Sequence, residues 1–223
     1  MATSREVPGF WETAGATKTF THPLDRDLLT AHVPRGARVL DYGCGYGRLT
    51  GELDLLGYRA RGVDSSSALI ERGRRERPAP DLTHCPDLPL PFEAGSFDAA
   101  LLFAVLTCVP QDVAQREILR ELARLVRPGG VLYLSDVPLQ SDPHHLRRYA
   151  EHAPEHGEHG VFSTPDGGVF RHHEPDHLRT LLQDSGFTVD EERTDTVGTL
   201  DGHTVERLQL LARRSPAAAG GPA

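Results

Sequence analysis

A nearly unbroken apolar run, FDAALLFAVL at residues 97–106, sets the tightest limit on how this chain can fold. A strand with one wet face alternates apolar and polar side chains, whereas a run of this kind is typical of a strand buried on both faces. Such strands occur in parallel sheets that helices cover on either side. The run is also too short to cross a bilayer, which takes about 20 apolar residues. The sequence therefore predicts an α/β protein.

Segments typical of strands and helices alternate around this run. We predict strands at 37–41, 58–64, 82–85, 97–106 and 131–136, and helices at 48–57, 65–77 and 111–126. Pro-Gly-Gly at 128–130 is expected to separate the last of these helices from the strand that follows. A further helix is predicted at 175–185, and two closing antiparallel strands at 187–195 and 204–214. This order predicts a Rossmann-like, doubly wound sheet with right-handed crossovers.

Changes in this pattern divide the chain into segments. Residues 31–136 form the predicted core, and residues 175–214 supply its last helix and closing strands. Residues 137–174 are polar and rich in histidine, and they contain VFST-PDGG-VFRHH, which predicts a hairpin. We interpret this segment as a small cap insertion. Residues 1–30 precede the pattern and are interpreted as a lid, and residues 215–223, rich in Gly and Pro, are predicted to be disordered.

Charge and cysteine content narrow the range of partners. Acidic residues outnumber basic ones 32 to 24, and the net charge of −8 argues against nucleic acid, because duplex binding depends on Lys and Arg at phosphates. The 3 Cys form no CxxC pair, which argues against a disulfide framework. No apolar signal-peptide core or membrane-spanning stretch occurs. We expect a cytoplasmic protein without a membrane partner, and leave its oligomeric state open.

The strongest functional signal is VLDYGCGYGRLT at residues 39–50. Gly43 and Gly45 follow a predicted strand and precede a helix, so the chain can turn sharply and approach a ligand closely. Asp64 ends the next strand, where a carboxylate accepts hydrogen bonds from ribose hydroxyls. A nicotinamide dinucleotide site has a third glycine where this chain has Arg48. The turn therefore favours a nucleoside ligand that lacks a pyrophosphate.

Four blocks of sequence resemble class I S-adenosylmethionine-dependent methyltransferases of the small-molecule type. They are VLDYGCGYG at 39–47, VDSS at 63–66, DLPLPFEAGSFDAALLF at 87–103 and LARLVRPGGVLYLSD at 122–136. The blocks arrive in the family's order and spacing. The resemblance implies a seven-stranded sheet with an antiparallel last strand, and S-adenosylmethionine (SAM) as the cofactor. It also implies methyl transfer to an oxygen or nitrogen of a small-molecule acceptor.

The resemblance implies roles for residues at the methionine end of the cofactor. Asp41, Gly43 and Gly45 would line this end, and Phe103 would lie beneath it. Arg48 would pair with the methionine carboxylate, or else be a solvated helix residue.

The nucleoside end of the cofactor is implied in the same way. Asp64 would hold the ribose hydroxyls, with Ser65 beside it, and Asp87 and Leu88 would meet the adenine. Many relatives carry the adenine-side acid one position earlier, where this chain has Pro86.

The acceptor site is expected in the lid and the cap, outside the sheet pattern. GFWETAGATKTFTHPL at residues 9–24 interleaves aromatic and basic residues, and it could close over the ligand and exclude water. The alternative is an N-terminal helix packed on the sheet. The residues that we expect to contact the acceptor are Trp11, Lys18, Phe20, His22 and Tyr149.

The cap strand VFRHH at residues 169–173 supplies the catalytic candidates His172, His173 and Arg171. An oxygen or nitrogen acceptor loses a proton around transfer, and imidazole accepts one near neutral pH. Alternation places Phe170 and His172 on one face and Arg171 and His173 on the other. We favour His172 as the base, because its apolar neighbour suits a dry pocket, whereas Arg171 and His173 face away or hold the cap to the sheet. Alternatively, both histidines cap the next helix or bind water.

Histidine content also raises the question of a metal, since 8 of the 12 histidines lie between residues 144 and 177. HAPEH at 152–156 matches the H-x-x-E-H pattern of one zinc-protease class, which needs both histidines on one helical face. Pro154 argues against a helix there. We therefore predict no metal site.

Three other functions remain as alternatives to small-molecule methyl transfer. A SAM-fold protein could bind the cofactor without transferring its methyl group. A methyltransferase could act on tRNA or protein, although the charge balance argues against RNA. A nicotinamide-dependent dehydrogenase is disfavoured by Arg48.

Overall fold

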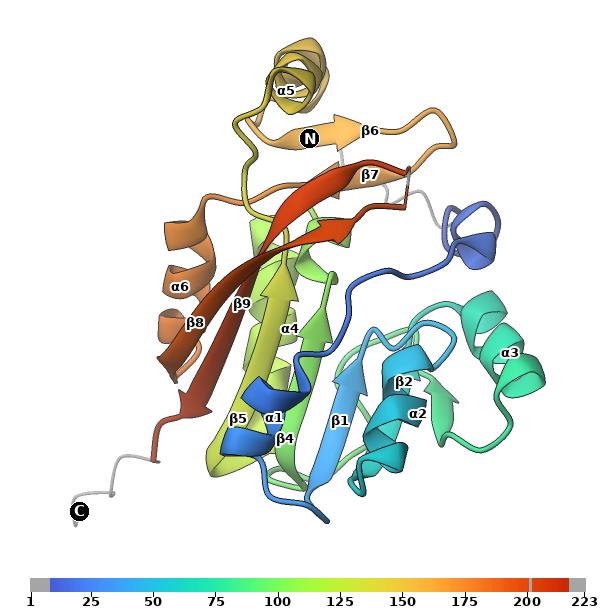
Figure 1. Ribbon diagram of the computed structural model, residues 1–223, viewed down its shortest axis with the longest axis vertical. Coiled ribbons are helices and arrows are strands. Elements are labelled where there is room, and N and C mark those ends of the chain that lie inside the picture. The colour runs from blue at the N-terminus through green and yellow to red at the C-terminus, as the bar shows by residue number, and fades with distance from the viewer. Residues whose placement is uncertain (1–8, 201, 217–223) are drawn as a thin grey trace.

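A seven-stranded sheet runs through the middle of the molecule, with helices on both faces and a cap beyond one end (Figure 1). The computed structural model describes residues 9–200 and 202–216. The strands of this sheet are β1 Arg38–Tyr42, β2 Arg59–Asp64, β3 Leu82–His84, β4 Phe97–Phe103, β5 Val126–Asp136, β8 Phe187–Gly198 and β9 Thr204–Arg214. The helices beside it are α1 Arg26–His32, α2 Arg48–Leu55, α3 Ser67–Glu76, α4 Asp112–Leu125 and α6 Pro175–Asp184. Two short 3₁₀ turns, Gly15–Thr17 and Leu106–Cys108, complete the connections.

The strands lie in the order β3-β2-β1-β4-β5-β9-β8. Strands β1 to β5 pair in parallel, and β9 runs antiparallel to both β5 and β8. The predicted Rossmann-like sheet with an antiparallel last strand is therefore confirmed. The chain leaves β1 toward β2 on one side, and β4 lies on the other. A crevice opens at such a switch point, at the carboxyl ends of the strands, and open α/β sheets bind their ligands there.

Strand β4 has the two-sided burial that its apolar run predicts. Leu101 and Phe103 pack toward α1 and α2, whereas Ala100 and Leu102 pack toward α4 and α6. Each fully buried leucine contributes about 1.5–3 kcal/mol of hydrophobic free energy. Because both faces are covered, the carboxyl end of β4 is held rigidly beside that of β1.

The Pro-Gly-Gly segment differs from its prediction. Helix α4 ends at Leu125, and β5 begins at the next residue, so that 128–130 lie inside the strand. The pairing of β4 with β5 shifts register here, and Gly129 has φ +73°. Glycine adopts this conformation without the steric cost of a side chain, so the segment forms an irregularity in the strand where we expected a separate turn.

The cap contains a helix that the sequence analysis did not predict, α5 Pro143–His156, in addition to the predicted hairpin of β6 Val161–Ser163 and β7 Val169–Arg171. Asp142 caps this helix, and its Oδ1 accepts hydrogen bonds from the backbone N–H groups of His144 and His145 at 3.0 and 3.2 Å. No described helix is long and apolar enough to cross a membrane.

Pro154 lies inside α5, so the prediction that it prevents a helix is wrong. A proline in a helix removes one backbone donor and crowds the preceding turn. Here it falls in the last turn, just before Gly157 ends the helix in the left-handed conformation. At that position most of the helix is already formed on its N-terminal side, and the cost is small enough for the helix to continue to His156.

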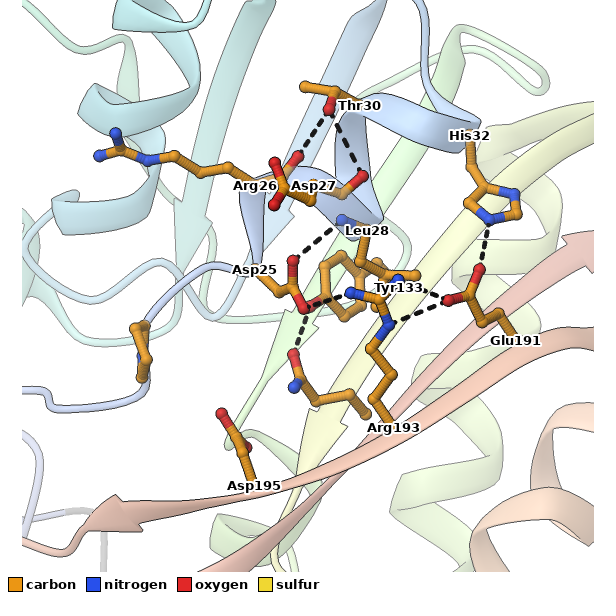
Figure 2. Close-up of polar contacts among 12 residues, drawn as sticks. Asp25, Arg26, Asp27, Leu28, Thr30, His32, Tyr133, Glu191, Arg193 and Asp195 are labelled. Atoms are coloured by element: carbon orange, nitrogen blue, oxygen red, sulfur yellow. Dashed lines mark hydrogen bonds and ion pairs between the residues drawn. The ribbon is translucent and has the colours of Figure 1, made fainter.

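An ion pair at the first end of α1 and a histidine–carboxylate contact at the other join this helix to the closing strand β8 (Figure 2). Asp25 caps α1 by accepting from Leu28 N at 2.9 Å, and its other oxygen accepts from Arg193 at 2.7 Å. Arg193 also donates to Glu191 at 2.9 and 2.6 Å. The second carboxylate oxygen of Glu191 lies 2.9 Å from His32 Nε2, in the last turn of α1. These contacts attach helix α1, which follows residues 9–24, to the sheet.

Arg207 on β9 is a deeply buried cation, with 1% of its surface exposed. It donates to the two carboxylate oxygens of Asp195, its cross-strand partner, at 2.7 and 2.5 Å. Its remaining nitrogen donates to the carbonyl of Pro23 at 2.6 Å. One guanidinium thus connects β8, β9 and the chain that leads into α1.

We predict that Arg207→Ala lowers the free energy of unfolding by about 2–3 kcal/mol, because it removes a buried guanidinium together with its hydrogen bonds to Asp195 and to the carbonyl of Pro23. Urea denaturation measures this change. The matched control is Arg213→Ala on the same strand, whose pair with Asp190 is 42% exposed on the arginine side. Such exposed pairs contribute about 0–1 kcal/mol. Equal losses in the two variants would contradict the role given to Arg207.

Candidate functional site

A cavity of about 1080 Å³ opens at the carboxyl ends of β1, β2 and β4, beneath residues 9–24 of the lid and beneath the cap at residues 137–174. The predicted residues that line it are Asp41, Gly43, Arg48, Asp64, Ser65, Asp87, Leu88, Phe103, Trp11, Lys18, Phe20, His22 and His172. Gly45, Tyr149, Arg171 and His173 are predicted site residues that do not line this cavity. The lid, the core and the cap therefore meet at one site.

The glycine turn after β1 folds back on the end of β2. The backbone N–H groups of Gly43 and Cys44 donate to the carbonyl of Val63 at 2.9 and 3.0 Å. Gly43 has φ +71°, and a Cβ there would lie 2.4 Å from a methyl carbon of Val105. Only glycine fits this position, so the backbone itself forms that part of the cavity wall.

Gly45 lies under the lid, at the edge of the cavity. A Cβ on it would lie 2.0 Å from the ring of Phe20, which packs directly on the turn. Phe20 is held there by its backbone N–H, which donates to the Tyr46 hydroxyl at 3.1 Å, and its ring lies 5.0 Å from that of Tyr46. The ring of Phe20, a lid residue, therefore covers Gly45.

Asp64 connects the glycine turn to α3. Its Oδ2 accepts from the backbone N–H of Gly45, and its Oδ1 accepts from that of Ser66, both at 2.8 Å. Burial raises the pKa of this carboxyl above its usual value, while the two backbone hydrogen bonds oppose that rise. Each carboxylate oxygen has a further lone pair, so the side chain can accept hydrogen bonds from two ligand hydroxyls.

The methionine side of the predicted cofactor site contains Asp41 and Arg48. Asp41 is 2% exposed, and it accepts from the Thr50 hydroxyl at 2.7 Å. Burial raises the pKa of Asp41 to about 6, although the hydrogen bond from Thr50 and the charge of Arg48 both lower it. A neighbouring cation is therefore part of what keeps this carboxylate ionised.

Arg48 and His22 carry buried nitrogens that no described residue satisfies. Arg48 donates from Nη2 to the carbonyl of His22, whereas Arg48 Nε and His22 Nδ1 have no hydrogen-bond partner in the described part of the chain. Burial, with the charges of Arg207 and Arg48, lowers the pKa of His22 to about 4. Unsatisfied buried polar nitrogens are costly, and these two side chains line the cavity. The Nε–H of Arg48 is suited to receive an anionic ligand group, whereas the neutral His22 can only donate or accept a hydrogen bond at Nδ1.

Glu12 is a site residue that sequence reasoning missed. Its carboxylate accepts from the backbone N–H and the hydroxyl of Ser67 at 2.8 and 2.9 Å, and from Ala68 N at 3.2 Å, at the start of α3. Ser66 adds a hydrogen bond from its hydroxyl to the carbonyl of Trp11 at 2.9 Å. A carboxylate at a helix N-terminus is favourable, but nothing in the local sequence shows which helix an acid in a preceding loop will reach.

The lid also contacts the cap. Lys18 forms a 2.5 Å ion pair with Asp166 in the loop between β6 and β7. The ring of Phe10 meets that of Phe170 edge-to-face at 5.7 Å, and Trp11 meets Phe170 at 6.3 Å. These aromatic rings, together with Phe162 of the cap, line the cavity. Residues 9–14 of the lid form turns, Gly15–Thr17 form a 3₁₀ turn, and no α-helix occurs within residues 9–24. The helix of the N-terminal segment that packs on the sheet, α1, begins only at Arg26.

The three catalytic candidates of the cap strand have different surroundings. His172 lines the cavity, and its Nδ1 lies 2.6 Å from the Tyr149 hydroxyl. Arg171 binds Asp112 at 2.5 Å, the carbonyl of Pro110 at 2.8 Å, and Glu158. Arg171 therefore attaches the cap to the loop before α4, outside the cavity lining.

His173 also lies outside the cavity lining, and it is 1% exposed. Its ring stacks on that of His177 with centroids 5.6 Å apart, and neither ring nitrogen has a hydrogen-bond partner among the described residues. Burial, with the nearby charges of Arg171 and His177, lowers the pKa of His173 to about 3. It is a neutral imidazole within the packing between cap and core.

The continuation of α5 past Pro154 brings the metal-binding pattern together. His152 and His156 lie one turn apart with stacked rings 6.2 Å between centroids. Ligand atoms of His152, Glu155 and His156 all lie within 4.8 Å of one another. His156 Nε2 meanwhile lies 3.0 Å from the Ser163 hydroxyl. The sequence argument against a metal at this motif was that Pro154 prevents a helix, and the observed helix removes that argument. Glu155, one of the three residues, has a side chain that is 64% exposed.

The fold, the glycine turn and the carboxylate at the end of β2 define a nucleoside-binding α/β protein of the Rossmann-like class. The family model of the methyltransferase domain matches residues 18–192. The chain belongs to the methyltransferase domain family.

Known relatives agree with this placement. The chain is 32% identical over 141 residues to a ubiquinone biosynthesis O-methyltransferase of Xanthomonas axonopodis pv. citri, covering 56% of this chain and 55% of that protein. It is 29% identical over 198 residues to the O-methyltransferase cnsE of Penicillium expansum, covering 81% of this chain and 64% of that one. The chain thus spans about half the length of the first relative.

Among solved structures, a SAM-dependent methyltransferase of Methanosarcina mazei superposes with a TM-score of 0.80. The two chains are 26% identical, and the match covers 85% of this chain and 98% of that one. The similarity thus covers most of this chain and nearly all of that one.

The buried, neutral His173 generates a prediction for stability against pH. The unfolded chain titrates this histidine near 6.5, whereas the folded pKa is about 3, so between these values only the unfolded state binds the proton. Stability is therefore complete above about pH 6.5 and falls as the pH drops below it. Urea denaturation at about pH 7 and about pH 5 should show a smaller loss in His173→Leu than in the unmodified protein. An unchanged pH slope would contradict this assignment.

Proposed function

We propose that this protein transfers the methyl group of SAM to an oxygen or nitrogen of a small-molecule acceptor. The observation that carries the proposal is the Asp64 carboxylate, held by two backbone N–H groups beside the glycine turn at the switch point between β1 and β4. This is the geometry in which an α/β sheet binds a ribose. Membership of the methyltransferase domain family supports the same reaction.

The residues present fit SAM along the cavity. Asp64 would accept the ribose hydroxyls, and the exposed rim residues Asp87 and Leu88 would meet the adenine. The unsatisfied Nε of Arg48 would receive the methionine carboxylate, and Phe103 would lie beneath the methionine chain. When bound, SAM supplies an electrophilic methyl group on a sulfonium. The protein's own part is to hold the acceptor atom in line with that group and to exclude water.

The acceptor is proposed to bind between the glycine turn and the cap. That half of the cavity is lined by Trp11, Phe20 and Phe162, and by His172. We propose that His172 contacts the acceptor, whereas Arg171 and His173 support the cap. The partners are then small molecules, and the three free cysteines are compatible with the reducing cytoplasm, where we place the protein.

We predict that SAM and S-adenosylhomocysteine bind with micromolar affinity and that NAD does not, because Arg48 occupies the position where a dinucleotide site needs glycine. Asp64→Asn should weaken SAM binding by about 1–3 kcal/mol, since the ribose loses a charged acceptor. Calorimetry with each ligand measures both effects. Asp81→Asn, an exposed acid paired with Arg61, is the control and should bind SAM normally. Tight binding of NAD, or an unchanged affinity in Asp64→Asn, would contradict the proposal.

We further propose that the reaction uses no metal ion. A lone pair on oxygen or nitrogen displaces a sulfonium without a Lewis acid, so proximity and a base are sufficient. Formation of S-adenosylhomocysteine with a working acceptor should therefore persist after dialysis against EDTA. If EDTA abolishes activity and added zinc restores it, the proposal of a metal-free reaction is contradicted. His152, Glu155 and His156 would then have a catalytic role.

A further inference from the structure

The cap presents two hydrogen-bonded pairs at the acceptor half of the cavity. One is Tyr149–His172, with 2.6 Å between the hydroxyl and Nδ1. The other is Asp142–His145, with 2.6 Å between Asp142 Oδ2 and His145 Nδ1. Both histidines line the cavity, and their rings lie 5.6 Å apart. The sequence analysis considered His172 and did not consider His145.

Asp142 determines which nitrogen of His145 carries the proton. Its other oxygen accepts the backbone N–H groups at the start of α5, so the carboxylate is held in place as the helix cap. These hydrogen bonds and the contact with His145 lower the pKa of Asp142 to about 2. An ionised carboxylate 2.6 Å from Nδ1 requires Nδ1–H, which leaves the lone pair of the neutral ring on Nε2. No described residue forms a hydrogen bond with His145 Nε2.

Tyr149 influences the tautomer of His172, and it favours the tautomer opposite to that of His145. The Tyr149 oxygen accepts the backbone N–H of Gln140 at 3.1 Å, and its own hydroxyl proton is then available for the lone pair of His172 Nδ1, 2.6 Å away. Burial raises the pKa of Tyr149 to about 12, so it keeps that proton. With Nδ1 accepting, the neutral His172 ring has its proton on Nε2. His172 is therefore oriented as a hydrogen-bond donor, and His145 as an acceptor.

The surrounding wall indicates what kind of acceptor would fit between them. Phe162 meets His172 edge-to-face at 5.0 Å, and Phe170 lies 6.1 Å from Phe162. Phe10 and Trp11 of the lid close the same side. Edge-to-face aromatic surfaces of this kind favour a flat aromatic ring. The titratable neighbours of His145 are Asp142, His144 and Tyr149 on its own segment and His172 across from it.

We infer that Asp142 and His145 form the proton-accepting pair for a phenolic acceptor, with His172 donating a hydrogen bond to it. This inference rests on the proposed methyl transfer. The phenol O–H bond breaks, and its proton goes to His145 Nε2. The oxygen lone pair forms the new bond to the methyl carbon, while the electron pair of the broken carbon–sulfur bond stays on sulfur. The products are a methyl ether and S-adenosylhomocysteine, and the imidazolium, stabilised by Asp142, returns its proton to water.

The test compares two acceptors of different acidity, catechol and 4-nitrocatechol, with SAM at a pH slightly above neutral. The nitro group makes the phenol ionise near neutral pH, so this acceptor hardly needs a base. We expect the unmodified protein to methylate both. His145→Gln should lower kcat for catechol by on the order of 10²-fold or more, and for 4-nitrocatechol by much less. A residue that only supports packing would affect both acceptors equally.

Three further variants sharpen the result. Asp142→Asn keeps a good helix cap and removes the charge, so it should reproduce the acceptor-dependent loss in weaker form. His172→Gln should slow both acceptors alike, because it removes a donor and leaves the base. His144→Gln is the matched control, since His144 is the adjacent histidine on α5 and lies outside the cavity lining. It should leave both rates unchanged.

Equal loss for the two acceptors in His145→Gln, with SAM affinity intact, would overturn the inference. So would a protein that binds SAM and methylates neither phenol, and that result would leave the proposed function standing. Failure to bind SAM at all would instead remove the proposed function, and the inference with it. If His145→Gln does not fold, the acceptor dependence in Asp142→Asn decides the question in the same way.

Discussion

The cavity depends on one buried carboxylate. Asp64 ends β2, and its two oxygens hold the turn after β1 and the approach to α3 through backbone N–H groups. Taking a carboxylate out of water is costly, which is why its pKa is raised, and these hydrogen bonds offset that cost. Because the same side chain holds two connections, the turn after β1 and the approach to α3 are fixed relative to each other, and each carboxylate oxygen keeps a lone pair for a ligand.

Closure of the site comes from segments distant in sequence. Glu12 attaches the lid to the start of α3, and Lys18 joins it to Asp166 of the cap. The aromatic contact between Phe10 and Phe170 completes the enclosure. Excluding water from this space strengthens the electrostatic interactions inside it. The ring of His145 is buried at this wall, whereas its partner Asp142 is 48% exposed and holds the ring from the outer side.

Much of the fold could be predicted from local patterns, and the errors have identifiable causes. The order and type of the sheet elements follow from apolar runs and turn residues. Helix α5 was missed because its polar, histidine-rich sequence obscures the signal that Asp142, Pro143 and Gly157 carry as cap, first-turn proline and C-terminal glycine. Pro154 was given too much weight, since a proline in a last turn removes little of the helix. The failure to consider His145 follows directly from the failure to predict α5.

The sequence by itself determined the doubly wound sheet, the glycine turn and the acid at the end of β2, because each depends on residues close together in the chain. Only the tertiary structure decided which of the cap's histidines reach the cavity, that Phe20 covers Gly45, and that Arg171 and His173 turn toward the core. It also decided how His145 and His172 differ. Their tautomers depend on Asp142 and on Tyr149, and the direction of each proton is set by a partner that only the folded cap places within 2.6 Å.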